Sequence, residues 1–548
     1  MTETPTSGGA ETRWGMVVDL NRCVGCQTCT IACKHANDTP PGVQWRRVLD
    51  VERGTFPDVE RLFLVTGCQH CAEPPCVPVC PTGATAQRAD GLVTMDYDTC
   101  IGCGFCAVAC PYQARTIVHD KSWYYGEPTV QERHVRHDDR YGVANKCTFC
   151  VERIDEALDE GLTPGVDLSH TPACVSSCIA GALHFGDFAN TDSNVSNLTR
   201  ENASFQMHAE LGTDPQIKYL YEVPNATPGR DAAPEDTDDA VLGRPEDPLV
   251  GERQTFWDIR AAMNFTLGGM SAGLIIVALI AHLIARTDNS WLFIGMGESG
   301  LLLLYLFAGI GMAVGLFCVF LEMGRKLRSL YVLRRPQSSW MTRETYAVLV
   351  LYPALMADLI WPNMALHIVV ALAAVGFLYS QGRILYAGRG IPAWRVEAMP
   401  SMLVVTGLFE GAGWLAVAVA LLRGTESTGD AVALLLCVLA AENARRWYVY
   451  CRDARMNGIG PLARREIERI RLALHLIGHA TPVALGIVVL TGGPSWTLAG
   501  AGLSAVAGGA LWKIIVITRA CHQQGFALPK MPRRGSGSRA APARLGGL

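Results

Sequence analysis

The chain has 548 residues, of which 49% are hydrophobic and 18% charged, and its mean hydropathy is +0.19. Residues 1–250 hold 19 Lys and Arg against 36 Asp and Glu, a net charge of −17, whereas residues 251–548 hold 28 against 15, a net charge of +13. This division excludes a single soluble globular enzyme and a disordered chain. It also excludes a nucleic-acid binder, because an acidic soluble half cannot neutralise phosphates.

The segment Met1–Trp14 is polar and has no basic stretch, apolar core or twin-arginine pair, so we expect no export signal. Sixteen of the twenty cysteines follow between Cys23 and Cys178. Without an export signal, so many cysteines favour metal binding over a disulfide framework.

The sixteen cysteines form four quartets. The quartets are Cys23, Cys26, Cys29 and Cys33; Cys68, Cys71, Cys76 and Cys80; Cys100, Cys103, Cys106 and Cys110; and Cys147, Cys150, Cys174 and Cys178. A tight loop with thiolates at i, i+3 and i+6 can wrap three irons of one cubane cluster, and the fourth cysteine then ligates a neighbouring cluster. Structural zinc would instead show isolated C-x2-C pairs, often with histidine. The spacing therefore predicts iron–sulfur clusters.

With these quartets, residues 15–190 resemble the four-cluster electron-transfer subunits of the molybdopterin oxidoreductases, such as dimethyl sulfoxide, polysulfide and nitrate reductases. The resemblance implies ferredoxin-like dicluster repeats in which the first quartet pairs with the fourth and the second with the third. The ligand sets it implies are Cys23, Cys26, Cys29 and Cys178; Cys147, Cys150, Cys174 and Cys33; Cys68, Cys71, Cys76 and Cys110; and Cys100, Cys103, Cys106 and Cys80.

Two positions bear on the number and properties of these clusters. Some members of the family have Trp in the third quartet and hold a three-iron cluster, but Cys103 is present here, so four [4Fe–4S] clusters are implied. Ile179 follows Cys178 where the family usually has Pro. This residue is not a ligand, so the site is expected to survive with a different potential.

The cysteine-rich half shows no nucleophile elbow, Walker loop or acid–base pair, so we expect no catalytic residue in it. His35, His70 and His119 lie near cysteines and are expected to donate hydrogen bonds or face solvent. The chain divides into a cluster domain (1–190), a polar extension and linker (191–255), a membrane anchor (256–530) and a basic tail (531–548). Within the second of these, Asn225–Pro248 has the Pro, Gly, Asp and Glu content of a linker.

Eight apolar windows in the second half approach the roughly 20 residues that a membrane-spanning helix needs. The windows are 263–285, 299–321, 345–361, 364–382, 401–422, 431–448, 472–492 and 496–518. They predict an all-α bundle of eight transmembrane helices, with a break between the third and fourth at Trp361-Pro362-Asn363. Gly309, Gly311 and Gly315 lie inside an apolar window without a preceding strand, which favours close helix packing over a nucleotide loop.

Residues 256–530 resemble the membrane anchors of the dimethyl sulfoxide and polysulfide reductase families. The dimethyl sulfoxide reductase anchor has His-Leu-Gly and Ser-Trp…Glu motifs at its quinol site, and this chain has Glu322-Met-Gly324-Arg325 and Ser339-Trp340…Glu344. The resemblance implies a quinone site containing Glu322, Arg325, Trp340 and Glu344, with Glu322 in place of the histidine. Alternatively, the two glutamates lie at the membrane surface or pair with Arg325, Arg328 and Arg343.

Other ionisable residues lie inside the windows. Asp358, Glu410 and Glu442 could form a proton path or structural ion pairs. His282, His367, His475 and His479 raise the question of haem b, but the resemblance implies no haem, and no C-x-x-C-H motif for covalent haem occurs.

Basic residues predict the orientation of the bundle. With eight spans, the segments on the side of the cluster domain hold 26 Lys and Arg from residue 251 onward, and those on the opposite side hold 2. Because cytoplasmic loops carry the excess of basic residues, we expect a multi-pass protein of the cytoplasmic membrane with the cluster domain and both termini in the cytoplasm.

Together these features predict an electron-transfer and membrane-anchor subunit. It would pass electrons between a large molybdenum or tungsten pterin subunit and the quinone pool of the lipid bilayer. The expected orientation resembles that of sulfite dehydrogenase, which oxidises sulfite and reduces quinone. A quinol-oxidising reductase of the dimethyl sulfoxide, thiosulfate or polysulfide type is the alternative, and an ion pump powered by the clusters is a further one.

Overall fold

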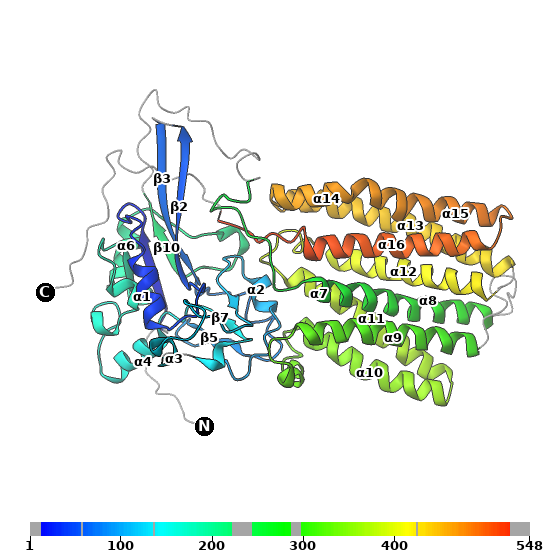
Figure 1. The fold of residues 1–548 in the computed structure, drawn as a ribbon, viewed down its shortest axis with the longest axis horizontal. Coiled ribbons are helices and arrows are strands. Elements are labelled where there is room, and N and C mark those ends of the chain that lie inside the picture. Colours follow the sequence, from blue (N-terminus) through cyan, green and yellow to red (C-terminus); the bar gives the residue numbers. More distant parts are fainter. Residues whose placement is uncertain are drawn as a thin grey trace.

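The computed structural model describes residues 12–55, 58–134, 137–221, 244–286, 298–422 and 426–526. Figure 1 shows two parts side by side along the longest axis of the molecule. Short strands and helices from the first half of the chain form one part, and long helices from the second half form the other.

The first part contains a four-stranded sheet in the order β8–β1–β10–β9. The strands are β1 (Trp14–Asp19), β8 (Leu183–Asp187), β9 (Ser204–Phe205) and β10 (Ile217–Leu220). The central strand β1 is buried along its whole length, and it pairs antiparallel with β8 and parallel with β10. The sequence placed the end of this domain at residue 190, but β10 belongs to its sheet. At four residues, β10 was too short to stand out from its polar surroundings.

Short elements around this sheet hold the cysteine loops. The hairpins pair β2 (Arg46–Thr55) with β3 (Asp58–Gly67), β4 (Thr85–Gln87) with β5 (Val93–Met95), and β6 (Thr116–Ile117) with β7 (Ala144–Asn145). The helices are α1 (Thr28–Ala36), α2 (Phe105–Ala109), α3 (Val130–His134), α4 (Val151–Asp159), α5 (Ala173–Ser176) and α6 (Asn194–Glu201), with the 3-10 turns η1 (Asp138–Arg140), η2 (Leu168–His170) and η3 (Ala209–Leu211).

All eight apolar windows are helical. The elements are α7 (Ile259–Met263), η4 (Asn264–Gly268), α8 (Gly269–Arg286), α9 (Glu298–Glu322), η5 (Lys326–Arg334), α10 (Trp340–Ile360), α11 (Met364–Ala387), α12 (Met399–Leu421), α13 (Glu426–Met456), α14 (Pro461–Ala473), η6 (Leu474–Ala480), α15 (Thr481–Leu490) and α16 (Trp496–Thr518). Of these, η5 is a 3-10 helix, and η4 and η6 are π-helical segments within longer helices.

Six helical segments of the described chain are long and apolar enough to cross a membrane. These segments are Ile259–Ile284, Glu298–Glu322, Met364–Ala387, Met399–Leu421, Pro461–Leu490 and Trp496–Thr518. They indicate a multi-pass membrane protein. The predicted third and sixth spans, now α10 and α13, do not meet the same criterion, because Arg343 and Glu344 open α10 and the end of α13 is rich in arginine.

Glycines allow close contact where the sequence predicts tight helix packing. A Cβ on Gly309 would lie 2.8 Å from Leu355 Cδ2, and one on Gly315 would lie 3.2 Å from Asn264 Cα. The predicted break between α10 and α11 is confirmed, because Asn363 caps α11 by accepting a hydrogen bond from Leu366 N–H.

The chain enters and leaves the helical part at the same end. Arg253 forms a β-bridge with His522, just after the last helix. The described C-terminal residues then reach the cluster domain, where His208 Nε2 lies 2.7 Å from the Gly525 carbonyl oxygen and Phe526 N–H binds the Leu249 carbonyl. Most of the predicted linker and the whole basic tail, 531–548, lie outside the described residues.

Candidate functional site

The cysteine loops of the first and third quartets turn sharply before a short helix. Gly25, between the first two cysteines of its quartet, has φ +70°, and Gly102 and Gly104 have φ +69° and +74° in the third quartet. This left-handed conformation favours glycine, which has no Cβ. The third cysteines of these quartets, Cys29 and Cys106, then lie on α1 and α2.

Asn37 joins cysteines from the first and last quartets. Its side-chain nitrogen lies 3.7 Å from Cys33 Sγ and 3.8 Å from Cys150 Sγ. The Cys33 sulfur also interacts electrostatically with the sulfurs of Cys147 and Cys174. The last cysteine of the first quartet therefore lies with three cysteines of the fourth.

The other cysteines group in a matching way. Cys29 interacts with Cys23, Cys26 and Cys178, Cys71 with Cys68, Cys76 and Cys110, and Cys103 with Cys80, Cys100 and Cys106. We name the groups the outer set (Cys23, Cys26, Cys29, Cys178), the second set (Cys33, Cys147, Cys150, Cys174), the third set (Cys68, Cys71, Cys76, Cys110) and the inner set (Cys80, Cys100, Cys103, Cys106). Their members are those that the family resemblance implies.

The sets form a row. Electrostatic interactions link each set to the next through the pairs Cys29 and Cys174, Cys68 and Cys147, and Cys76 and Cys106. The four cysteines of the inner set line one cavity together with Thr82, Thr85 and Met95. This row of four sulfur groups could hold four clusters in sequence.

Buried thiols and buried cations alternate along the row. Burial raises the pKa of Cys106 and of Cys110 to about 12, so these sulfurs need a nearby positive charge to become thiolates. Burial alone would lower the pKa of Arg115, but the sulfurs of Cys76 and Cys106 raise it well above its usual value. Arg115 also donates a hydrogen bond of 3.0 Å to Cys76 Sγ. The donor set suits a metal cluster, whose iron would supply the remaining positive charge.

Arg46 has the same role beside the second set. It is fully buried, and although burial alone would lower its pKa, the sulfurs of Cys174, Cys147 and Cys33 raise the value. Sequence reasoning missed both arginines, because neither lies next to a cysteine in the chain.

The three histidines near the cysteines have different positions. His70 is fully buried: it accepts a hydrogen bond from Val93 N–H at 3.1 Å, and its Nε2 lies 3.0 Å from the Cys147 carbonyl oxygen. Burial and the Lys146 ammonium lower its pKa well below the usual value, so the ring is neutral. His35 is exposed on α1, and His119 lines a hollow beside the helical part.

The inner set lies against the helical part. Trp257 Nε1 donates a hydrogen bond of 2.9 Å to the Cys103 carbonyl, and Arg325 N–H binds the Ile101 carbonyl at 3.1 Å. At the same place, Gly324 lies so close to Gly142 that a Cβ on Gly324 would be 2.1 Å from the Gly142 carbonyl oxygen. The backbone that follows α9 thus contacts the loop that carries the inner cysteines.

A hollow of about 720 Å³ opens beside this contact. Its lining includes Glu322, Arg325 and His119, together with Arg260, Leu321, Met323, Gly324, Lys326, Leu327 and Arg328. Glu322 Oε1 accepts a hydrogen bond of 2.9 Å from Asp258 N–H. The alternative pairing of these glutamates with neighbouring arginines is not seen among the described residues, since Arg325 and Arg328 donate to the carbonyls of Tyr141 and Tyr97.

Trp340 and Glu344 do not line this hollow. The guanidinium groups of Arg343 and Arg383 lie 4.2 and 4.9 Å from the centroid of the Trp340 ring. Glu344 is buried in the bundle and accepts a hydrogen bond of 3.3 Å from Asn264 Nδ2. The structure therefore divides the four predicted quinone residues into two pairs.

The other carboxylates in the helical part differ in burial and in hydrogen-bond partners. Glu442 is half-buried and pairs with Arg445 and Arg446. Near the C-terminal end of α10, buried Asp358 lies 2.6 Å from His367 Nδ1. The ring centroids of His367 and His282 are 5.8 Å apart.

Glu410 forms a buried ion pair with Lys513. The basic-residue count assigned Lys513 to the C-terminal segment, but this lysine is fully buried in α16. Nearby, His479 Nε2 lies 3.0 Å from Asn443 Oδ1, and Asn443 donates to Thr406 at 2.7 Å. His475 is exposed on the same π-helical segment as His479.

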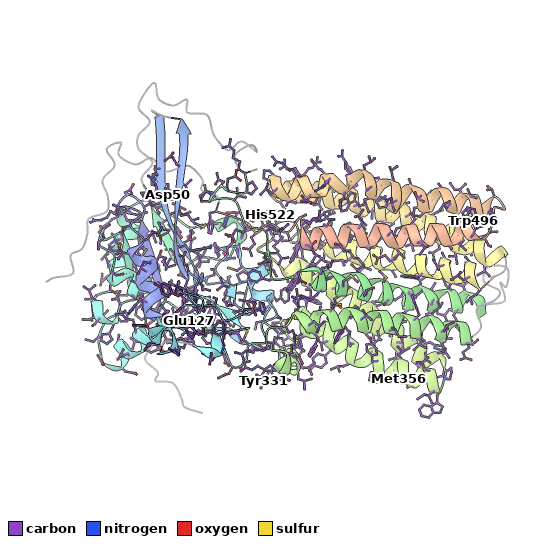
Figure 2. All side chains as sticks on the ribbon, in the orientation of Figure 1. Asp50, Glu127, Tyr331, Met356, Trp496 and His522 are labelled. Carbon is purple, nitrogen blue, oxygen red and sulfur yellow. The ribbon has the colours of Figure 1, made fainter. Side chains whose placement is uncertain are left out.

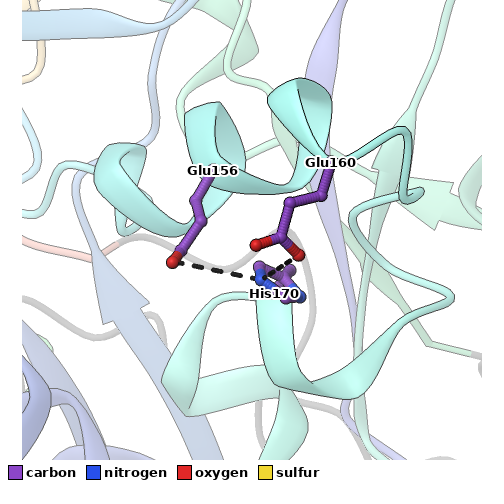
Figure 3. Close-up of side chains that lie close together, drawn as sticks. All are labelled: Glu156, Glu160 and His170. Atoms are coloured by element: carbon purple, nitrogen blue, oxygen red, sulfur yellow. Dashed lines mark ion pairs between the residues drawn. The ribbon is translucent and has the colours of Figure 1, made fainter.

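A separate group lies on the surface of the first part. Glu156 on α4 and Glu160 just after its end point toward His170, whose Nε2 is 3.9 and 3.4 Å from their carboxylate oxygens (Figure 3). Both glutamates are exposed, so the group resembles an ordinary surface ion pair more than a binding site.

Known proteins are similar to the cysteine-rich part of the chain. The 4Fe-4S dicluster domain family matches residues 59–124. The chain is 40% identical over 225 residues to the putative dimethyl sulfoxide reductase iron-sulfur subunit of Halobacterium salinarum, and the match covers 38% of this chain and 79% of that protein. It is 39% identical to a selenate reductase subunit of Mesobacillus selenatarsenatis, and this match covers 38% of this chain and 72% of that protein. It is also 39% identical to a sulfite dehydrogenase subunit of Allochromatium vinosum, and this match covers 38% of this chain and 83% of that protein.

Proposed function

The chain belongs to the iron–sulfur subunits of the molybdopterin oxidoreductases, and we propose that it carries electrons between a molybdopterin catalytic subunit and membrane quinone. Its first half is a ferredoxin-like iron–sulfur domain, and its helical part fits a membrane anchor. The observation that carries the proposal is the row of four cysteine sets, which begins at an exposed cysteine and ends against the helices of the same chain.

Each set would hold one [4Fe–4S] cluster, giving four in all. The sets supply four sulfurs each, and Arg46 and Arg115 add buried positive charge beside the second and third sets. Because each cluster transfers one electron at a time, the row would convert a two-electron reaction on the partner into single steps.

The outer end would receive the catalytic subunit. Cys26 is exposed there, and the apolar side chains of Val24, Ile31 and Ile179, each within two residues of an outer-set cysteine, are 44%, 63% and 75% exposed. Exposed apolar residues around a redox centre are typical of a protein contact.

The inner end would deliver electrons to quinone in the hollow that Glu322 and Arg325 line. Its volume lies within the 300–1,000 Å³ range of small-molecule sites. Glu344 would supply protons to the same site from inside the bundle. The two glutamates are linked to one short segment of the chain, because Glu322 binds Asp258 and Glu344 binds Asn264. Reduction of quinone to quinol takes two electrons and two protons, and these carboxylates could supply the protons.

Eight crossings are consistent with the path of the chain. The chain that follows α9 contacts the cluster domain at Gly142, and the chain that follows α11 contacts it at Gly390, whose N–H binds the Val108 carbonyl. The helix α10 must therefore run away from the cluster domain between them, and Figure 1 shows α10 and α13 beside the other long helices. The excess of basic residues at the cluster-domain end supports a cytoplasmic orientation.

Sulfite is the substrate that we propose for the catalytic partner. Oxidation of sulfite to sulfate with water releases two electrons and two protons, and the electrons would reduce quinone through this chain. The support is the orientation argument together with the 39% identity to a sulfite dehydrogenase subunit over 83% of its length. Relatives named for dimethyl sulfoxide and selenate reductases are equally similar, so the quinol-oxidising direction is the competing candidate.

The test is to purify the chain in complex with its catalytic partner and supply sulfite with a soluble quinone analogue. We expect sulfite-dependent quinone reduction and reduction of the clusters by sulfite alone. Cluster oxidation by dimethyl sulfoxide or selenate after reduction with quinol, without any response to sulfite, would establish the competing direction.

A further inference from the structure

A fully buried ion pair lies in the helical bundle. Lys513 Nζ, on α16, donates a hydrogen bond of 2.6 Å to Glu410 Oε2, on α12, and neither side chain is exposed. Apolar residues of similar size usually stabilise a buried site at least as well, because two charges are costly to desolvate. Charged residues inside a membrane bundle are therefore expected to have a function.

Polar side chains lead from this pair toward Glu344. Gln381 Nε2 donates a hydrogen bond of 3.0 Å to the Asn264 carbonyl, and Asn264 Nδ2 donates to Glu344 Oε1. The Gln381 side chain also interacts with Glu344. All three side chains are buried, so this connection runs inside the bundle.

Gly269 lies beside both Lys513 and Gln381. A Cβ on this residue would lie 2.8 Å from Lys513 Nζ and 3.3 Å from Gln381 Oε1, so both polar atoms reach the same glycine. A side chain here would collide with both atoms, whereas glycine places no side chain between them.

Three acceptor atoms along this line have unused hydrogen-bonding capacity. Asn264 Oδ1, Gln381 Oε1 and Glu410 Oε1 are buried, and they receive no hydrogen bond from the residues that the structure describes. Buried acceptors are normally satisfied by protein donors or ordered water. Asn264 also begins the π-helical segment η4, and π-helical turns are frequent at functional sites.

We propose that Lys513 and Glu410 form an internal proton donor that refills Glu344 through a hydrated line past Gln381 and Asn264. The proposal rests on the proposed quinone reaction and adds its proton source. When Glu344 releases a proton toward the quinone site, a proton leaves the Lys513 ammonium and restores the Glu344 carboxyl group. The free amine beside the Glu410 carboxylate then takes up a proton from the aqueous phase, so one proton enters this sequence for each proton that leaves Glu344.

The decisive variant is Lys513→Arg in the complex with the catalytic partner. Arginine keeps the positive charge that pairs with Glu410, but it does not release a proton at accessible pH. We expect at least tenfold slower quinone-linked turnover and a larger rate ratio between H₂O and D₂O. Electron delivery to an artificial dye and the cluster signals should be unchanged. Wild-type quinone turnover in Lys513→Arg would overturn the proposal.

A matched carboxylate distinguishes this role from a general loss of charge. Glu410→Gln should slow quinone turnover as Lys513→Arg does, whereas Glu442→Gln, which removes a carboxylate that pairs with Arg445 and Arg446 on α13, should not. Equal effects of the two glutamine variants would contradict the assignment.

The unaltered complex gives a test that needs no substitution. A relay moves more than one proton in the slow step, so quinone turnover plotted against the D₂O fraction should curve. A straight line would contradict the relay. Absence of quinone turnover in the unaltered complex would instead remove the proposed function on which the relay rests.

Discussion

The two ends of the cysteine row have opposite surroundings. At the outer end Cys26 is exposed among exposed apolar side chains, including Ile179. At the inner end the loop of Cys103 is covered by Trp257 and by the backbone at Gly324, from the helical part of the same chain. Figure 2 shows side chains filling the contact between the two parts of the molecule.

This difference indicates two kinds of contact. The inner contact joins two parts of the same folded chain. Backbones come so close there that only glycine fits, as at Gly324 and Gly142. The outer end has the exposed apolar residues expected for a partner that is a separate polypeptide. Electron transfer to the anchor should therefore depend on internal packing, and electron transfer from the catalytic subunit on association.

Removal of an inner ligand should give the largest effect. Cys103→Ser is expected to abolish or convert the inner cluster, lowering the iron content below the roughly sixteen atoms expected for four [4Fe–4S] clusters. Quinone-linked turnover should fall at least a hundredfold, about 2.7 kcal/mol, while dye-linked activity of the partner persists. Cys318→Ser, which alters a cysteine of α9 outside the sets, is the control. Electron paramagnetic resonance and iron analysis check both variants, and unaltered iron content in Cys103→Ser would contradict the ligand assignment.

Separation of the two parts should have the next largest effect. Gly324→Ala places a Cβ against the Gly142 backbone, so the inner contact must open by a few tenths of an ångström or more. We expect a loss of about 1–3 kcal/mol in stability, as for overpacked sites, and slower electron transfer from the clusters to quinone. Gly300→Ala, near the start of α9 and with open space around it, should change neither thermal unfolding nor turnover.

A charge at the outer end should act on association alone. Ile179→Arg is expected to weaken binding of the catalytic subunit about tenfold, or 1.4 kcal/mol, because a charge would enter an apolar contact. Titration of the separated subunits measures this. Leu330→Arg, an exposed apolar residue on η5 at the other end of the row, should bind the partner normally. Equal weakening by both variants would mean that the outer end is not the docking surface.

The smallest effect concerns a potential rather than a contact. Arg115→Gln removes a buried positive charge that lies next to the Cys76 and Cys106 sulfurs, so the reduced state of the adjacent clusters loses stabilisation. Midpoint potentials should fall by an amount on the order of tens of millivolts. Arg88→Gln, which alters a partly exposed arginine paired with Asp155, should leave them unchanged in a redox titration.

The sequence predicted the cysteine row well because its information is local. Spacing such as Cys100-x2-Cys103-x2-Cys106 determines which sulfurs share a loop. The family resemblance implies that the last cysteine of each quartet joins the set of its paired quartet. Arg46 and Arg115 could not be found in this way, because they approach the sulfurs only after folding.

The helical part was predicted less completely. Hydropathy located every long helix, but it could not show that Trp340 lies away from the hollow of Glu322 or that Lys513 faces inward. A lysine near the end of an apolar window looks the same whether it faces water or a buried carboxylate. The partner that distinguishes the two cases, Glu410, is about a hundred residues earlier in the chain.

The return of the last described residues to the cluster domain has a consequence for biosynthesis. The bond between buried His208 and the Gly525 carbonyl, and the pairing of Phe526 with Leu249, join residues of the first half of the chain to residues that a ribosome makes roughly 300 positions later. The iron-binding half thus emerges well before its final contacts exist, while the helices are still being inserted. Cluster loading is therefore expected to proceed on an open domain during this interval, before Gly525 and Phe526 form their contacts.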